Sequence, residues 1–367
     1  MRRPRFLDYY RQFEAISPEE DSQRLRVRRD EQKSRDLELA PPLDLSRSDW
    51  HEPPDPEVVN AATYALRRSL NRYPAADSAP ARAAVADRHG LAREQIVVGH
   101  GAGQLLQGAV RSLAAGGEVL LPWPAWNALP ALILRSGGRP VPLAGGLEGA
   151  AAAAGPDTRA VVLCSPNDPT GELVTHGALR DLAAALPHTV TILLDEALVE
   201  FAGEDASAVT LVDEIPNLLV FRSFSKAWAM AGLRAGYAAG PRAEASLLAG
   251  LGPGLGVATP AQFAVVAALE GEGRARRRMK EGCRRVAAER ERLAGRAGRS
   301  GFTCSESSAH VVWMRHERLG AREVTDALAD QRILVAPGTG WNDDEHVRVT
   351  LRDRAATERL LSALASL

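Results

Sequence analysis

Between residues 57 and 249, unbroken apolar runs alternate with segments rich in Ala, Leu and Arg that are typical of helices. Strands whose residues are apolar without alternation are buried on both faces, as in parallel sheets that helices cover on each side. This alternation predicts an α/β domain with a mainly parallel sheet. The five runs are Gln95–Val98, Glu118–Leu121, Ala160–Cys164, Val190–Leu194 and Leu218–Phe221.

The segments on either side of this region have a different pattern. Residues 1–45 are polar and charged with helical patterning and contain a break at Ala40-Pro-Pro42, which predicts an N-terminal helical arm and linker. We expect the large domain over residues 46–256. Residues 257–367 contain Arg- and Ala-rich helices over 260–298 and then short apolar runs, which predicts a smaller α+β domain. These runs are Ala309–Met314, Ile333–Val335 and His346–Leu351.

Charge and composition exclude several classes of partner. The formal net charge of −1, with Arg and Asp/Glu interspersed, gives no reason to expect nucleic acid or an anionic membrane. No apolar run approaches the length of a membrane span, and the basic start lacks the apolar core of a secretory signal. Three scattered cysteines predict neither a disulfide framework nor a metal cluster. We therefore expect a cytoplasmic protein that binds a small molecule.

In open α/β sheets, ligands bind beyond the carboxyl ends of the strands, so the residues that follow each apolar run are candidates for a binding site. After Val98, the loop Gly99–Gln104 leads into a helix, and its amides would suit a phosphate, although glycine-rich turns also occur for steric reasons. Asp195 ends another apolar run, where a carboxylate needs a cation or a donor. Its partner would be either a ligand cation or groups of the protein in a capped turn.

Lysine is rare in this chain. Of 45 basic residues only Lys33, Lys226 and Lys280 are lysines, so 42 are arginines. A Schiff-base nucleophile must lose its proton, which lysine can do and arginine effectively cannot. Lys33 and Lys280 lie in charged runs that predict solvated helix faces. Lys226 instead follows a buried run, as the last residue of Arg222-Ser-Phe-Ser-Lys226, and is the predicted nucleophile.

The ordered set of motifs over residues 45–355 resembles fold-type I pyridoxal 5′-phosphate (PLP) enzymes of the class I/II aminotransferase superfamily. The branches most similar in style are those of histidinol-phosphate aminotransferase and threonine-phosphate decarboxylase. The motifs that carry the resemblance are Arg72-Tyr-Pro74, Gly101-Ala-Gly103, Pro124-Ala-Trp126, Ser165-Pro-Asn-Asp-Pro-Thr-Gly171, Asp195-Glu-Ala197, Ser223-Phe-Ser-Lys226, Gly232-Leu-Arg234 and Val347-Arg-Val349.

The resemblance implies a PLP-dependent transferase fold, with a mainly parallel sheet of the seven-stranded type between helices and a smaller α+β domain. It also implies that Lys226 forms the Schiff base with PLP and moves the proton at the substrate α-carbon. Asp195 would pair with the pyridine nitrogen, and Trp126 would stack on the ring unless it is a core residue. The implied phosphate-binding residues are Gly101, Ala102, Gly103, Ser223, Ser225 and Arg234.

Two further roles follow from the resemblance. Tyr73 would reach the phosphate in the neighbouring subunit, which implies a homodimer; the alternative is a tyrosine in a surface turn. Arg348 would bind the substrate α-carboxylate in a bidentate pair, and the alternative is an arginine exposed on a strand.

The chain departs from the family at two positions that concern the phenolic oxygen of PLP. The family usually has Asn directly before Pro-Thr-Gly, whereas this chain has Asp168 there and Asn167 one residue earlier. A Tyr commonly lies three residues after the pyridine-binding Asp, and here Leu198 takes its place. An ionised Asp168 beside a phenolate would be a like-charge contact, so Asp168 is protonated, or turns away, or Asn167 replaces it as a cofactor- and substrate-binding residue.

The sequence thus predicts a PLP-dependent aminotransferase acting on an amino acid or a small amine-bearing metabolite. The alternative is another PLP carbanion reaction of specialised metabolism: decarboxylation, β- or γ-elimination or replacement, cyclisation or oxidation. A PLP-binding homologue without turnover is a third possibility, against which the set of Lys226, Asp195 and Arg234 argues. No motif identifies the substrate or the role of the N-terminal arm.

Overall fold

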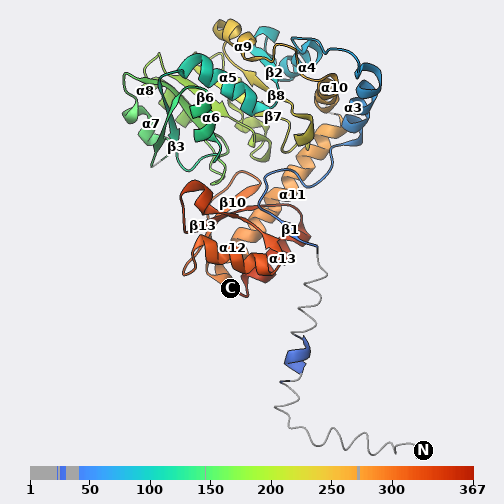
Figure 1. Cartoon of the computed structure of the whole chain (residues 1–367), viewed down its shortest axis with the longest axis vertical. Helices are drawn as coiled ribbons and strands as arrows, with labels where there is room; N and C mark the ends of the chain where they lie inside the picture. The colour runs from blue at the N-terminus through green and yellow to red at the C-terminus, as the bar shows by residue number, and fades with distance from the viewer. Residues whose placement is uncertain (1–22, 24, 30–40, 145, 271–272) are drawn as a thin grey trace, which may run out of the picture.

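The computed structural model describes residues 23, 25–29, 41–144, 146–270 and 273–367. The described part consists of a large and a small lobe joined by one long helix, α11 (Arg274–Ala297) (Figure 1). Most of the predicted N-terminal arm, including Lys33, lies outside the described residues.

A seven-stranded sheet forms the centre of the large lobe, as the resemblance implied. Its order is β2 (Ile96–Gly99), β8 (Gly236–Ala239), β7 (Leu218–Ser223), β6 (Thr191–Asp195), β5 (Thr158–Cys164), β3 (Glu118–Pro122) and β4 (Arg139–Leu143). Only β8 is antiparallel to its neighbours β2 and β7 among these strands. The carboxyl ends of β5, β6 and β7 therefore meet at one edge, where their following loops form a common site.

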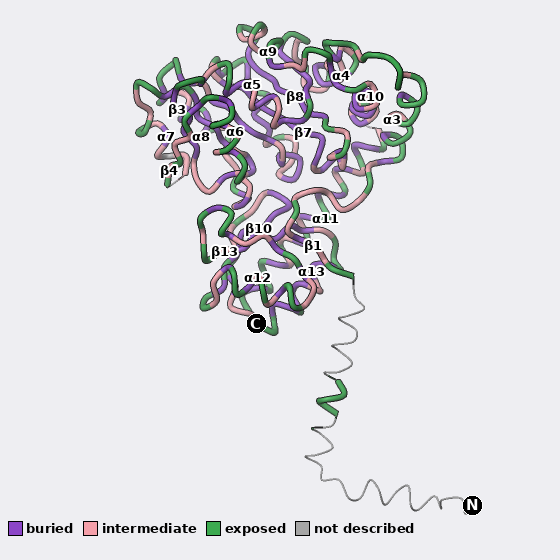
Figure 2. Tube along the Cα trace, viewed as in Figure 1, coloured by how far each residue is buried: buried purple, intermediate pink, exposed green. Residues whose placement is uncertain are grey.

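Helices cover both faces of this sheet, which explains the unbroken apolar strands. Along β7, Leu218 and Val220 enter one core cluster and Leu219 and Phe221 enter the other. Burying each of these side chains contributes about 1.5–3 kcal/mol. Buried residues fill this central layer, and a further set lies inside the small lobe (Figure 2). The large-lobe helices are α3 (Pro56–Ser69), α4 (Ala79–His89), α5 (Ala102–Ala114), α6 (Leu129–Arg135), α7 (Glu148–Ala153), α8 (His176–Ala185), α9 (Ala245–Leu251) and α10 (Thr259–Leu269).

The small lobe is α+β, with a four-stranded antiparallel sheet. Its strand order is β12 (Ala336–Pro337), β13 (His346–Thr350), β10 (Val311–His316) and β9 (Phe302–Cys304). The other helices of this lobe are α12 (Ala321–Asp330) and α13 (Arg354–Leu364). Asp353 begins α13 by accepting a hydrogen bond from the Ala356 N–H, a standard N-cap contact.

The packing places two segments differently from the expected domain limits. β1 (Leu43–Asp44) pairs in parallel with β11 (Ile333–Leu334), so the end of the expected linker belongs to the small lobe. α10 packs against α3 and α4, although the expected large domain ended at residue 256. The change of lobe therefore occurs along α11, which follows α10.

Candidate active site

A cavity of about 240 Å³ opens at the carboxyl ends of β5, β6 and β7. It gathers residues from six separate sequence motifs, because the parallel strands deliver their following loops to one edge. The predicted site residues that line it are Ala102, Gly103, Trp126, Asp168, Asp195, Ser223, Ser225, Lys226 and Arg234.

Lys226 lies just beyond β7 with its amine inside this cavity. Its Nζ donates to the Ser48 hydroxyl at 2.6 Å and to the Ser48 carbonyl at 3.1 Å. Burial lowers the pKa of Lys226, which favours the neutral amine that a nucleophile requires. Ser48 was not among the predicted site residues, because its segment reaches the site from the chain before α3 and carries no motif.

Asp195 is the last residue of β6 and is buried. Its Oδ1 accepts a hydrogen bond from the Ala197 N–H at 3.0 Å. Burial raises the pKa of Asp195 to about 6, so the ionised carboxylate is costly without a cation beside it. A protonated ring nitrogen would supply that cation.

An anion-binding corner lies between the first turn of α5 and the loop after β7. No side chain caps the start of α5, so the N–H groups of its first turn are available to a ligand. Arg234 lies opposite and donates from Nη1 to Ser225 Oγ at 3.2 Å and to the Ala231 carbonyl at 2.9 Å. Two serine hydroxyls, a guanidinium and a helix N-terminus form the donor set that a phosphate requires.

Two glycines make this corner compact. Gly101 has φ of +83°, and a Cβ there would lie 2.9 Å from Arg234 Nη2. A Cβ on Gly236 would lie 2.5 Å from the Ala102 nitrogen. The backbone of α5 can therefore approach β8 and Arg234 only with glycine at these positions.

Trp126 forms a partly buried wall of the cavity. Its Cη2 would lie 3.5 Å from a Cβ built on Gly103, so the indole lies beside the first turn of α5. An indole face in this position suits a flat ring lying between the anion-binding corner and Lys226.

The remaining predicted residues are in three different surroundings. Asn167 donates to the Pro124 carbonyl at 2.8 Å and to Thr170 Oγ1 at 2.9 Å, and it lines a neighbouring cavity instead of that of Lys226. Asp168 faces the active-site cavity and pairs with Arg348, at 2.9 and 3.0 Å from Nη1 to its two oxygens. Tyr73 is 87% exposed on the surface of the large lobe.

These residues fit PLP by their chemistry. Lys226 is a buried amine of lowered pKa, Asp195 is a buried carboxyl group that needs a cation, and the corner at Arg234 supplies donors for a phosphate. Leu198 lines the same cavity, so the family's Tyr is replaced by an apolar side chain inside the site itself.

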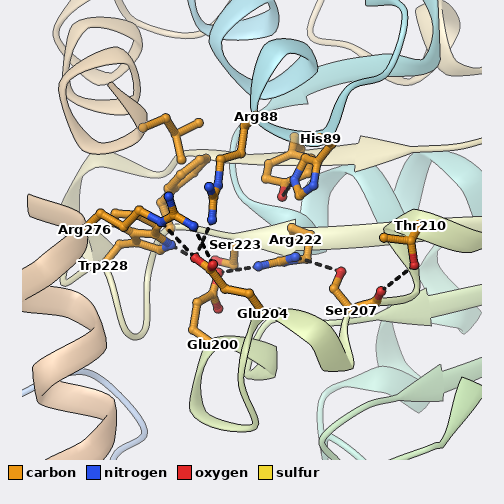
Figure 3. Close-up of a pocket in the computed structure, with 13 residues that line it drawn as sticks. Arg88, His89, Glu200, Glu204, Ser207, Thr210, Arg222, Ser223, Trp228 and Arg276 are labelled. Carbon is orange, nitrogen blue, oxygen red and sulfur yellow. Dashed lines mark hydrogen bonds and ion pairs between the residues drawn. The ribbon is translucent and has the colours of Figure 1, made fainter. Parts of the chain in front are cut away.

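A second polar cavity of about 250 Å³ lies next to the first, and Ser223 lines both (Figure 3). Arg222 pairs there with Glu200 at 2.6 Å and with Glu196 at 3.6 Å. Glu204 pairs with Arg88 and, at 2.6 Å, with Arg276 of α11. The sequence did not predict this cluster, because its members come from distant segments and share no motif.

Comparison with known proteins agrees with this geometry. Residues 41–364 match the family model described as aminotransferase class I and II. The chain is 32% identical over 324 residues to an aromatic amino acid aminotransferase of Cutibacterium acnes, covering 85% of this chain and 88% of that protein. It is 36% identical over 322 residues to an aromatic amino acid aminotransferase of Corynebacterium jeikeium, covering 84% and 83%.

Among solved structures, histidinol-phosphate aminotransferase from Sinorhizobium meliloti in complex with PLP superimposes with a TM-score of 0.79 at 26% identity, covering 92% of this chain and 93% of that one. The chain therefore belongs to the class I and II aminotransferase family. It is a PLP-dependent aminotransferase, and the predicted fold class, cofactor and enzyme class are confirmed. None of the helices in the described part of the chain is long and apolar enough to cross a membrane.

Proposed function

We propose that this enzyme transfers amino groups with PLP held covalently at Lys226. The observation that carries the proposal is that Lys226, Asp195 and the anion-binding corner at Arg234 line one cavity. When bound, PLP draws electrons from the carbon that carries the substrate amino group. Nζ of Lys226 would carry the proton to and from that carbon.

The other residues of the cavity would hold and orient the cofactor. Asp195 would keep the ring nitrogen protonated, and Trp126 would cover one face of the ring. The phosphate would be bound by Ser223, Ser225, Arg234 and the first-turn amides that follow Gly101, at Ala102 and Gly103. Arg348 would face the group next to the amine-bearing carbon.

An absorbance spectrum of the purified protein tests the cofactor site. We expect a band near the visible–ultraviolet boundary that bleaches with borohydride and is missing in Lys226→Ala. Incubation with amino acids and 2-oxoglutarate then tests the transfer itself, with glutamate as the expected product. A protein that shows no band after PLP is added would contradict the assignment of Lys226.

We propose aromatic amino acids and related amines as the first substrates to test. Relatives at 32–36% identity carry the name aromatic amino acid aminotransferase. Trp126, Pro166 and Leu198 also give the cavity apolar walls that suit an aromatic side chain.

We further propose a homodimer in which Tyr73 of one subunit reaches the phosphate in the other. Its 87% exposure in the single chain leaves the ring free for such a contact. Light scattering tests the mass, and mixing Tyr73→Ala with Lys226→Ala tests the shared site: mixed dimers contain one site with both residues intact. Failure of the mixture to regain activity would count against the role of Tyr73. We also propose a cytoplasmic location, which cell fractionation tests.

A further inference from the structure

Arg348 is engaged by the protein's own groups on three sides. It lies on β13 of the small lobe, is 7% exposed, and directs Nη1 at both oxygens of Asp168. Its Nη2 donates to the Ser46 carbonyl, and the Trp341 ring lies 5.4 Å from the guanidinium carbon. Both terminal nitrogens, which would form the fork for a carboxylate, thus already have acceptors.

Asp168 also balances the charge of Arg348, although the buried Nε has no hydrogen-bond partner among the described residues. Asp168 comes from the loop after β5 of the large lobe and lines the cavity of Lys226, so its carboxylate lies where a substrate would approach. A neutral Asn at position 168 would leave the guanidinium charge of Arg348 available to an incoming anion. With Asp168, a substrate carboxylate must displace one negative charge and then remain close to it.

A neutral substituent avoids this competition. A hydroxyl or an amide N–H can donate to an Asp168 oxygen while the pair with Arg348 stays intact, because each carboxylate oxygen accepts more than one hydrogen bond. The pair therefore forms a ready acceptor for a hydroxymethyl or carboxamide group next to the amine-bearing carbon.

We propose that Asp168 determines the substrate class of this enzyme. By occupying Arg348, it favours amines that carry a neutral hydrogen-bond donor, such as amino alcohols and amino amides, over the corresponding α-amino acids. α-Amino acids also react, but their carboxylate must compete with Asp168 for Arg348. The inference rests on the proposed function, because it takes the cavity of Lys226 as the place where the amine is bound.

The test compares matched, unreactive probes on the PLP-loaded protein: hydrocinnamate, which has the carboxylate, and hydrocinnamyl alcohol, which does not. Wild type should bind the carboxylate no more tightly than the alcohol. Asp168→Asn should bind hydrocinnamate at least about tenfold more tightly and the alcohol no more tightly than wild type does. In the Arg348→Ala background, Asp168→Asn should increase the affinity for hydrocinnamate less than it does with Arg348 present, because only the repulsion between Asp168 and the carboxylate is then relieved.

The same comparison can be made with two substrates that react, an amino alcohol and the corresponding amino acid. The ratio of kcat/KM for L-phenylalaninol to that for L-phenylalanine should fall at least about tenfold in Asp168→Asn. Unchanged hydrocinnamate affinity in that variant, or an equally large increase without Arg348, overturns the proposal. Should the variant fail to fold, tighter binding of hydrocinnamate than of the alcohol by wild type overturns it. Loss of the borohydride-sensitive band in wild type would instead count against the proposed function.

Discussion

Two polar cavities of similar volume lie side by side in the large lobe, and they differ in how their charges are paired. In the cavity of Figure 3, Arg88, Arg222 and Arg276 each pair with a carboxylate. In the active-site cavity, Lys226 and Arg234 make no ion pair within the part of the chain that the structure describes. Charges that are already neutralised by a partner are occupied within the fold, whereas basic groups without a carboxylate partner are available to a ligand.

The Asp168–Arg348 pair is an exception to this contrast. It lies at the active-site cavity but is paired like the residues of the neighbouring cluster. Arg234 would therefore be available to the cofactor phosphate at one end of the site, whereas at the other end the charge of Arg348 is already balanced by Asp168. This difference underlies the inference that neutral groups are preferred next to the amine.

Replacing the unpaired lysine should produce the largest effect on activity. Lys226→Ala is expected to lower kcat/KM by at least about 10³-fold, because both the covalent link and the proton carrier are lost. Mass spectrometry after borohydride reduction should show no covalent cofactor. Lys280→Ala is the matched control: this lysine is 40% exposed and 3.4 Å from Glu204, and its loss should leave activity unchanged. Retained covalent cofactor in Lys226→Ala would place the nucleophile elsewhere.

Breaking a pair in the neighbouring cavity should instead affect stability. Glu200 accepts hydrogen bonds from Arg222 at 2.6 Å and from Trp228 Nε1 at 3.1 Å, and its side chain is 4% exposed. Glu200→Gln leaves the buried charge of Arg222 less compensated and should lower the free energy of unfolding by about 3 kcal/mol, measured by urea denaturation. Activity per folded molecule should be kept.

The control for this loss is an exposed pair of the same chemistry. Glu214 pairs with Arg180 at the surface, so Glu214→Gln should have no measurable effect on stability. If Glu200→Gln were equally silent, the cluster of Figure 3 would have no special structural role.

The sequence predicted the parts of the fold that depend on burial on both faces of a strand. All five apolar runs of the large domain overlap strands β2, β3, β5, β6 and β7. It did not predict β4 or β8. Pro140 and Pro142 make β4 read as a loop, and prolines are tolerated there because β4 is an edge strand. β8 is a short Gly/Ala strand whose hydrogen bonds depend on partners distant in sequence.

The sequence predicted those residues of the candidate site that lie within single motifs, but not the contacts between motifs. Asp195 and Lys226 lie at the ends of β6 and β7, so the strand order brings them together, whereas Arg234 reaches the cavity from the loop between β7 and β8. The contacts between the two lobes could not be predicted from the sequence. Nothing in the Val347-Arg-Val349 motif indicates that Arg348 pairs with Asp168 or donates to the Ser46 carbonyl. Asn167 is directed away from the cavity of Lys226 because its side-chain amide donates to the Pro124 carbonyl and to Thr170. These contacts depend on the path of the loop, which the identity of the residue does not reveal.

The buried carboxyl group of Asp195 should make the stability of the cofactor-free protein depend on pH. Burial raises its pKa from 3.8 to about 6, so between these values the folded protein holds a proton that the unfolded chain has lost. Its contribution to the free energy of unfolding thus falls as pH rises through this window, by at most about 3 kcal/mol. Asp195→Asn cannot ionise and should gain stability over wild type as pH rises from 4 to 6.

A carboxylate with the opposite shift is the control, and both variants are measured by urea midpoints from below pH 3.8 up to pH 6. Partial burial opposes ionisation of Asp343, but hydrogen bonds from the N–H groups of His346 and Glu345 lower its pKa. Asp343→Asn should therefore lose stability relative to wild type as the pH rises to the ordinary Asp pKa of 3.8, and the difference should stay constant above it. Parallel pH profiles for the two variants would show that burial does not govern Asp195.

The smallest expected effect concerns Leu198, the apolar residue that lines the active-site cavity where the family commonly has Tyr. Leu198→Tyr adds a hydroxyl that can donate to the phenolic oxygen of PLP and stabilise its negative charge. The pKa of the lysine–cofactor linkage, followed by absorbance titration, should then fall by about one unit. Leu198→Phe has the same ring without the hydroxyl and should leave that pKa unchanged. Equal shifts in both variants would attribute the effect to packing, and no shift in Leu198→Tyr would mean that position 198 does not control the charge on the cofactor.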